Sequence, residues 1–306
     1  MQHTVKSAVT FTGRGLHSGA PVRMVVRPAP ADHGIVFLRS DIQHGDRLIP
    51  ALWDAVVPSR LCTLIANGAG ASVSTIEHIM AALAGLAIGN ALIEIDGPEV
   101  PILDGSAAPF VGAILAHGVQ PQHAPTRAIR VLQTVEVREG EALARLEPAE
   151  MLEIDFRIAF ADAAIGRQAR HLNMSNGAFV RELSDSRTFC RSSDVEAMRA
   201  RGLALGGTLE NAVVFDGDRI LSPGGLRHAD EPVRHKMLDA LGDLSLAGAP
   251  ILGRYTGIRA GHALTNRLLH ALFITPGAMR IDDCDYIAGG KLPGIGVVPD
   301  DLPACA

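Results

Sequence analysis

Residues 232–246, which read PVRHKMLDALGDLSL, combine an apolar stripe and an ionisable stripe with the spacing of one α-helix. The proline stands in the first turn, where a helix tolerates it, so we expect the helix to begin there. His235, Asp239 and Asp243 follow one another at intervals of four residues and share one helix face. That face borders the apolar stripe that includes Leu238, which is hard to reconcile with a purely solvated surface. The pattern favours a fold in which this helix presents its charges to a site.

His235 and Asp239 can be interpreted in two ways. An imidazole and a carboxylate at positions i and i+4 can chelate one zinc ion. The same spacing also produces ordinary His–Asp pairs on helix surfaces. Taken alone, the motif favours the surface pair, so the metal hypothesis needs further ligands.

Glu77 and His78 lie at the start of a helix that the apolar spacing predicts over residues 75–86. Ser74 and Glu77 have the S-x-x-E spacing of a capping box, in which the glutamate only ties back to the helix N-terminus. His78 can likewise be an ordinary helix histidine. Taken alone, this segment also favours the structural interpretation, because short motifs carry little information.

His262 follows Gly261 at the start of another expected helix, residues 261–273. A histidine in this position can cap the helix or simply be exposed to solvent. A functional interpretation is a general acid, since histidine titrates near neutral pH.

Together, these motifs are more informative than any one of them. His78, His235 and Asp239 form a set of three ligands that leaves a fourth position for water, as in catalytic zinc sites. Adjacent helical residues diverge by about 100°, so Glu77 would lie beside that water and accept its proton. Lys236 also flanks a ligand and can face a developing oxyanion or a substrate phosphate.

The composition argues against several classes of function. The chain has 306 residues, of which 47% are hydrophobic, and a formal net charge of −5, which does not fit nucleic-acid binding by a broad basic surface. The N-terminus lacks signal-peptide features, and no apolar stretch approaches the roughly 18 residues that a transmembrane helix needs. None of the four cysteines forms a C-x-x-C pair. We therefore expect a cytoplasmic protein with free thiols.

Strand and helix patterns occur in both halves of the chain, which favours an α+β fold with two domains. The segment 121–127 holds two prolines among polar residues and is the candidate boundary between domains at 1–122 and 127–306. Roughly the last 25 residues are rich in Gly, Pro and Asp, so we expect partial disorder there. Strands are expected within 21–40, 91–96, 128–139 and 151–160, and helices within 75–86, 107–117, 176–184, 232–246 and 261–273.

Several long motifs of this chain resemble those of UDP-3-O-acyl-N-acetylglucosamine deacetylases, a zinc enzyme family of lipid A biosynthesis. The similarity extends over roughly residues 3–300, and the motifs stand in the family's order. The segments that carry it are GRGLHSG (13–19), STIEHIMAALAGL (74–86), PILDGSAAPF (101–110), RTF (187–189), VRHKMLDALGDL (233–244) and GHALTNRLLHAL (261–272).

The resemblance implies two related α+β domains, each layering helices on a mostly antiparallel sheet, with the active site between them. It implies one zinc ion held by His78, His235 and Asp239, with ferrous iron as an alternative metal. The substrate would be the amphiphilic nucleotide sugar, and the reaction the hydrolysis of its N-acetyl group with release of acetate. We expect a monomer.

The resemblance also assigns roles to individual residues. Glu77 would be the general base and His262 the general acid, with Asp243 orienting His262. Around the substrate, Lys236 would assist the reaction, Thr188 would bind the oxyanion, Phe189 would pack on the nucleotide sugar, Arg259 would lie near its phosphates, and His17 and Cys62 would line the pocket.

The excursion at residues 188–221 matches the family insert that forms an apolar tunnel for the 3-O-acyl chain. The sequence departs from the family at Cys190, where many members have glycine, and at Arg191, which places a charge near the tunnel mouth. This departure leaves the preferred acyl length open. We find no fused dehydratase domain and therefore expect a monofunctional enzyme.

Two other functions remain as alternatives. One is a zinc amidase that acts on a different acylated sugar, which would differ in the tunnel and not in the metal site. The other is a non-catalytic protein that binds a metal or a nucleotide sugar. Such a protein would be expected to lack Glu77 or His262, and the presence of both favours the enzyme.

Overall fold

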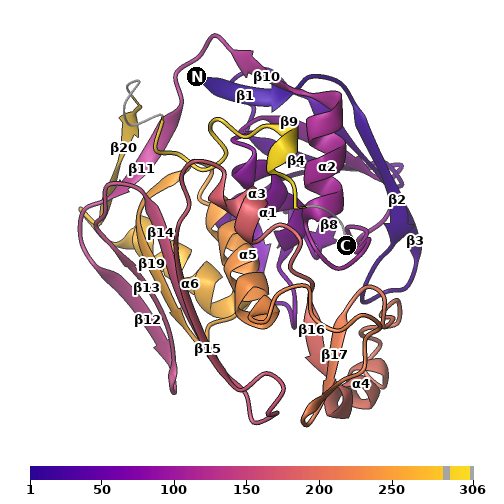
Figure 1. Cartoon of the computed structure of the whole chain (residues 1–306). Coiled ribbons are helices and arrows are strands. Elements are labelled where there is room, and N and C mark those ends of the chain that lie inside the picture. The colour runs from indigo at the N-terminus through magenta and orange to yellow at the C-terminus, as the bar shows by residue number, and fades with distance from the viewer. Residues whose placement is uncertain (285–289, 304–306) are drawn as a thin grey trace.

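Two β-sheets, each built from its own part of the chain, form the framework of the protein (Figure 1). The computed structural model describes residues 1–284 and 290–303. Most strand pairs in it are antiparallel, and helices pack against the sheets, so the expected α+β class is confirmed.

The first sheet has five strands, all of which precede residue 96. Its strands alternate between buried and partly exposed side chains, as in β9, where Ala91, Ile93 and Ile95 point into the core. The order across the sheet is β2 (Val9–Arg14), β3 (Pro21–Pro28), β9 (Ala91–Ile95), β4 (Ile35–Arg39) and β5 (Leu48–Pro50).

The second sheet has seven strands, all from residue 127 onward, and β19 is its central strand. β19 pairs in parallel with β11 and β14 and antiparallel with β13. The strands are β12 (Val135–Glu139), β13 (Ala142–Glu147), β19 (Ile251–Ile258), β11 (Arg127–Val131), β20 (Met279–Asp283), β14 (Leu152–Ala159) and β15 (Arg167–Asn173).

Three smaller sheets complete the strands of the described residues. They are β1 (Gln2–Val5) with β10 (Val119–Gln122); β6 (Val56–Val57), β7 (Leu64–Ala66) and β8 (Ser72–Ser74); and β16 (Phe189–Arg191), β17 (Val213–Asp216) and β18 (Arg219–Ile220). The sheet of β16, β17 and β18 belongs to the insert, residues 188–221, which Figure 1 shows projecting at the lower right. Two short 3-10 helices are η1 (Trp53–Ala55) and η2 (Pro299–Asp301).

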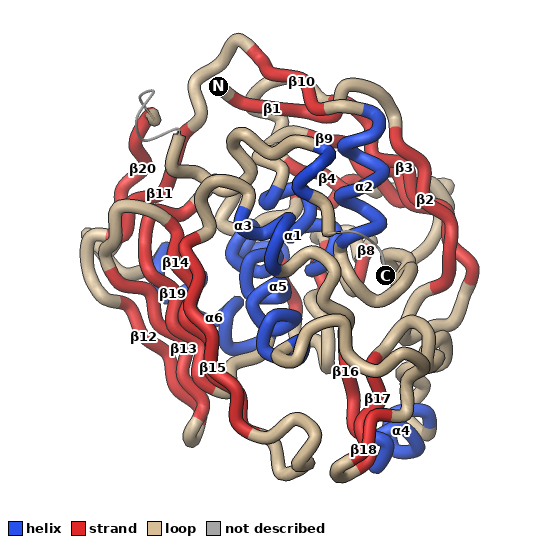
Figure 2. Tube along the Cα trace, in the orientation of Figure 1, coloured by secondary structure: helices blue, strands red, loops and turns tan. Residues whose placement is uncertain are grey.

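Helices α1, α5 and α6 gather between the two large sheets (Figure 2). α1 packs along α5, and α6 packs on α5 and on β12 and β13. Within the described residues, no helix is long and apolar enough to span a membrane. The helices are α1 (Glu77–Gly85), α2 (Ala108–His117), α3 (Ala178–Glu182), α4 (Ser192–Arg199), α5 (Glu231–Ser245) and α6 (His262–Ile274).

Most elements expected from periodicity are present. The helices over 75–86, 107–117, 176–184, 232–246 and 261–273 correspond to α1, α2, α3, α5 and α6. The strand-like run 128–139 is divided into β11, which ends at Val131, and β12, which begins at Val135. These two strands lie apart in the second sheet.

One large sheet is built from strands before residue 96 and the other from strands that begin at residue 127, and the division into domains at 1–122 and 127–306 stays a prediction. One hydrophobic cluster includes buried residues from both ranges. In the tail, Leu292 is buried and η2 packs against α2, whereas the expectation of disorder for 285–289 and 304–306 lies outside the described residues.

Gly242 allows the close approach of α1 and α5. A Cβ atom at this position would overlap the backbone carbonyl of Glu77, so the contact is backbone against backbone. Side chains on both helices therefore meet at short range beside this crossing.

We predict that Gly242→Ala destabilises the protein by about 1–3 kcal/mol, because the added methyl group must push α1 and α5 apart. Denaturant unfolding measures the change in the free energy of unfolding. Gly68→Ala is the matched control, since a Cβ there meets nothing within 4 Å. The control should change stability by no more than about 0.5 kcal/mol. Equal stability of the two variants would show that the helix contact tolerates a side chain.

Candidate metal and catalytic site

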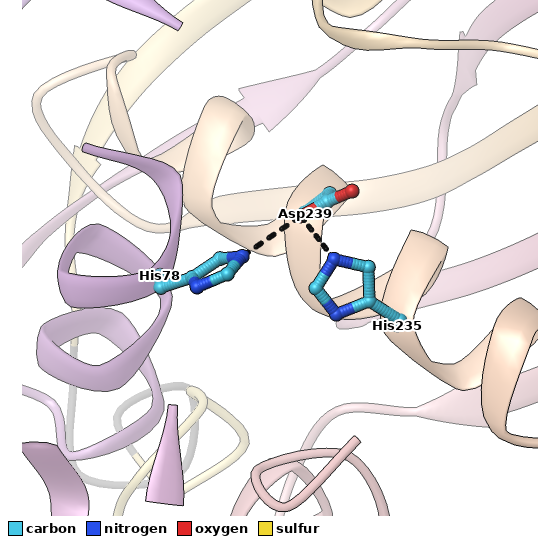
Figure 3. Close-up of side chains that lie close together, drawn as sticks. All are labelled: His78, His235 and Asp239. Atoms are coloured by element: carbon cyan, nitrogen blue, oxygen red, sulfur yellow. Dashed lines mark ion pairs between the residues drawn. The ribbon is translucent and has the colours of Figure 1, made fainter. Parts of the chain in front are cut away.

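His78, His235 and Asp239 meet at the crossing of α1 and α5 (Figure 3). Nε2 of His78 lies 3.7 Å from Oδ1 of Asp239, and Nε2 of His235 lies 3.3 Å from the same oxygen. The ligand atoms of the three residues all lie within 4.8 Å of one another. The structure therefore brings together the set that the sequence suggested, from two helices that lie far apart in the chain, α1 ending at Gly85 and α5 beginning at Glu231.

The protonation of these three residues suits a bound cation. Burial, together with the neighbouring His235, lowers the pKa of His78 to about 3, and burial also lowers the pKa of His235. Burial would raise the pKa of Asp239, but the adjacent His235 and Lys236 outweigh it and lower that pKa. The site thus offers two neutral imidazoles and one carboxylate, which are ligands for divalent metals.

A hydrogen bond on the side of the His235 ring that faces away from Asp239 orients the ring. Nδ1 lies 3.0 Å from the carbonyl oxygen of Ser186, to which its N–H can donate. This bond leaves Nε2 with a lone pair directed at Asp239. In turn, Oδ1 of Asp239 is buried and has no hydrogen-bond donor in the described part of the chain. A buried carboxylate oxygen is costly without a partner, and a metal ion here would supply one.

Glu77 and His262 face each other beside the three ligands. Oε1 of Glu77 lies 3.8 Å from Nε2 of His262, and that nitrogen is 3.7 Å from Oδ2 of Asp239. Nδ1 of His262 lies 2.9 Å from Oδ2 of Asp243, to which its N–H can donate. The side chain of His262 is only 13% exposed, so it is not an exposed histidine at a helix end.

The surroundings shift the pKa of both residues. Burial raises the pKa of Glu77 to about 7. Burial would lower the pKa of His262, but the carboxylates of Asp243, Glu77 and Asp239 overcome this effect and raise it to about 9. Between these values Glu77 is ionised and His262 is protonated, which are the forms of a base and an acid.

Glu77 does not form the capping box that the sequence allowed. α1 has no side-chain cap bond, and Oε2 of Glu77 accepts from the backbone N–H of Thr63 at 3.0 Å instead. The structural interpretation of Glu77 as a capping residue is therefore wrong. Its carboxylate turns into the site because Thr63 holds one of its oxygens there.

Lys236 contacts one of the ligands. Its Nζ lies 2.7 Å from Oδ2 of Asp239, and its side chain is 17% exposed. Burial would lower the pKa of this ammonium, but Asp239 outweighs it and raises that pKa, so Lys236 stays cationic beside the site.

A cavity of about 1250 Å³ extends from these residues into the insert. Thr188 and Phe189 line it, and the ring of Phe189 lies 6.3 Å from that of His235. The insert adds apolar side chains, among them Val195, Met198, Leu203, Leu209, Val214 and Leu221, and also the charged residues Arg191, Asp194, Glu196, Arg199 and Arg201. The cavity is thus polar at the ligands and mixed in the insert, where an apolar part lies beside charged side chains.

The other residues expected around the substrate differ in position. His17 lines the cavity, and its buried Nε2 has no hydrogen-bond partner in the described part of the chain. Arg259 and Arg191 also line it, paired with Glu141 and Asp162. Cys62 is buried with its Sγ 3.3 Å from the Ser59 hydroxyl and does not belong to the described cavity wall.

Sequence reasoning missed the buried ion pair of Arg187 and Glu231. Nε of Arg187 lies 2.9 Å from Oε1 of Glu231, which also accepts from the Arg187 backbone N–H at 3.0 Å. This pair holds Ser186, whose carbonyl orients His235, and Thr188 beside it. The i, i+4 spacing of Glu231 and His235 could have shown that Glu231 shares a helix face with a candidate ligand, whereas local spacing gives no signal for its partner Arg187.

Comparison with known proteins identifies similar chains over most of this length. A sequence model of the family described as UDP-3-O-acyl N-acetylglycosamine deacetylase matches residues 2–274. A protein of Phenylobacterium zucineum named UDP-3-O-acyl-N-acetylglucosamine deacetylase is 53% identical over 280 residues, which are 92% of this chain and 96% of that protein. Proteins of the same name from Anaeromyxobacter sp. strain Fw109-5 and Shewanella woodyi are 49% and 46% identical, and each alignment covers 92% of this chain and 91% or 92% of the relative.

We predict that the chain binds about one divalent metal ion and that His235→Ala and Asp239→Ala each lower this occupancy, because each removes a ligand. Elemental analysis of the purified variants measures it. His228→Ala is a matched control, since it removes a histidine that lies 2.8 Å from Asp185 outside the site. The control should keep the metal. Unchanged occupancy in Asp239→Ala would remove this residue from the ligand set.

Proposed function

The chain belongs to the UDP-3-O-acyl-N-acetylglucosamine deacetylase family, and we propose how its own residues carry out the deacetylation. It is a hydrolase that removes the N-acetyl group of UDP-3-O-acyl-N-acetylglucosamine in lipid A biosynthesis. The observation that carries the mechanism is the convergence of Glu77, His262 and a three-ligand metal site at one end of a cavity.

We propose zinc as the metal, with ferrous iron as the alternative. His78, His235 and Asp239 would hold it, and the partnerless Oδ1 of Asp239 supports this assignment. When bound, zinc polarises the acetyl carbonyl and lowers the pKa of water at the site. The protein contributes the orientation of His235 through the Ser186 carbonyl.

Glu77 is the proposed general base. Its Oε1 faces the site, and its pKa near 7 keeps it ionised at neutral to alkaline pH. It takes a proton from the attacking water as the water oxygen bonds to the acetyl carbon. The absence of a capping bond leaves this carboxylate available for that task.

His262 is the proposed general acid. Its protonated ring presents Nε2–H toward Glu77. Asp243 accepts a hydrogen bond from Nδ1–H, and its carboxylate stabilises the positive charge of the ring. As the carbon–nitrogen bond breaks, His262 donates its proton to the leaving amine, and acetate is released. Lys236 and Thr188 are proposed to stabilise the negative charge that develops on the carbonyl oxygen.

The cavity supports the proposed placement of the substrate. The apolar part within the insert would take the 3-O-acyl chain, and Phe189 would pack on the nucleotide sugar beside the ligands. Arg259 lies on the cavity wall and would attract the diphosphate, and His17 would offer its partnerless Nε2 to a polar group of the substrate. Buried Cys62 would act only indirectly.

We also propose that the protein works in the cytoplasm. Cys62 and Cys190 are free thiols, which fits a reducing compartment.

Arg191 lies on the cavity wall and pairs with Asp162 at 2.5 Å. This ion pair would hold the charge of Arg191 away from the apolar part of the cavity.

We predict that acetate release depends strongly on the acyl chain. Burying each CH2 group contributes about 0.8 kcal/mol, so about ten methylenes can supply several kcal/mol after ordering costs. The specificity constant for the unacylated nucleotide sugar should therefore fall by orders of magnitude relative to the 3-O-acylated substrate. Equal turnover of both would favour an amidase for another acylated sugar.

We predict that Glu77→Gln and His262→Ala each lower turnover by at least about 10²-fold while the metal is retained, since each removes one proton transfer. His270→Ala is a matched control on the same helix, because His270 packs against Trp53 away from the site. Its turnover should stay near that of the unmodified enzyme. Normal turnover of metal-loaded Glu77→Gln would require another base.

The same assignment predicts a bell-shaped pH dependence for the unmodified enzyme. Activity should rise as pH increases through the pKa of Glu77, about 7, because the base must be ionised. It should fall as pH increases through the pKa of His262, about 9, because the acid must be protonated. Loss of the alkaline limb in His262→Ala, measured on its residual rate, supports the assignment, and an unchanged limb contradicts it.

A further inference from the structure

Thr63 hydrogen-bonds both to the proposed general base, Glu77, and to Asp243, the partner of the proposed general acid. It lies directly before β7 and is 1% exposed. Its backbone N–H donates to Oε2 of Glu77 at 3.0 Å, and its hydroxyl donates to Oδ1 of Asp243 at 2.6 Å. These partners are 14 and 180 residues away in the chain, so only the tertiary structure unites them.

Each of the two carboxylates divides its oxygens between Thr63 and the site. Glu77 offers Oε2 to Thr63 and keeps Oε1 facing Nε2 of His262 at 3.8 Å. Asp243 offers Oδ1 to the Thr63 hydroxyl and keeps Oδ2 for Nδ1 of His262 at 2.9 Å. One residue therefore fixes the rotation of both carboxylates about their side-chain bonds.

The direction of the Thr63 hydroxyl is set by a third partner. Asn266, four residues after His262 on α6, lies with its Nδ2 3.3 Å from the Thr63 oxygen and donates to it. The hydroxyl hydrogen is then left for Asp243. A short bond to an ionised, buried acceptor is among the stronger hydrogen bonds in proteins.

We propose that Thr63 is a positioning residue for deacetylation, whose N–H and hydroxyl hold the base Glu77 and the Asp243–His262 pair in one fixed relation. This inference rests on the proposed roles of Glu77 and His262. The hydroxyl acts through Asp243, so its loss affects proton delivery by His262 more than substrate binding. The backbone N–H remains in any substitution and continues to hold Glu77.

The test compares Thr63→Val, which keeps the side-chain shape without the hydroxyl, with Thr63→Ser, which keeps the hydroxyl. With the acylated nucleotide sugar, kcat of metal-loaded Thr63→Val should fall about 10- to 100-fold, the size expected from one charge-assisted hydrogen bond. KM should change little, and Thr63→Ser should recover most of the loss. Thr265→Val is the matched control, since it removes another buried hydroxyl on α6, one that lies 2.9 Å from Tyr255.

The control variant should keep kcat within about threefold of the unmodified enzyme, as expected for a residue outside a catalytic network. Placing Thr63→Val in the His262→Ala background should add little further loss, because the residue through which it acts is absent. A merely structural role would cost as much in that background, and it would not be rescued by serine. If Thr63→Val does not fold with metal, Thr63→Ala is judged by the same criteria.

Three results would overturn the inference: a near-normal kcat in metal-loaded Thr63→Val, an equal loss in Thr63→Ser, or an undiminished loss when Thr63→Val is placed in the His262→Ala background. These results differ from those that would show the proposed function to be wrong. If the proposed function is wrong, the unmodified enzyme releases no acetate, or His262→Ala retains full turnover.

Discussion

The crossing of α1 and α5 is the contact on which the rest of the site depends. Gly242 allows the α5 backbone to touch the carbonyl of Glu77, so ionisable side chains from both helices meet in the interior. Charges removed from water are costly unless each finds a partner. Here Asp239 faces two imidazoles and an ammonium, and Asp243 faces an imidazole and a hydroxyl.

The carboxylate oxygens of this cluster differ in how they are partnered. Oδ1 of Asp239 lies near both histidine Nε2 atoms but has no hydrogen-bond donor in the described part of the chain. A cation between the three ligands would supply this missing partner. The raised pKa values of the two proton-transfer residues have different causes: burial raises that of Glu77, whereas the carboxylates around His262 raise its pKa against the effect of burial.

The site and the insert differ in how they are built into the fold. The site is built on helices that pack between two sheets, so its side chains are held by the hydrophobic core. The insert contributes a short sheet and α4, which has no buried residue, and it encloses the apolar part of the cavity. A polar end built on buried helices and an apolar part within the insert correspond to the two parts of an amphiphilic substrate.

Sequence alone predicted most of the elements and a candidate ligand set. The i, i+4 stripe of α5 predicted that His235, Asp239 and Asp243 share a face. Short motifs at two other helix starts suggested Glu77, His78 and His262, and the resemblance then implied their roles. The sequence could not separate the capping box from the catalytic carboxylate, because S-x-x-E spacing fits both. Only the tertiary structure decided that question, through the bond from Thr63 to Glu77. The structure also buries Cys62 outside the described cavity wall, and the neighbouring residue Thr63 contacts the site residues instead. Such assignments depend on which side chains meet across 180 residues of chain, and local spacing carries no record of that distance.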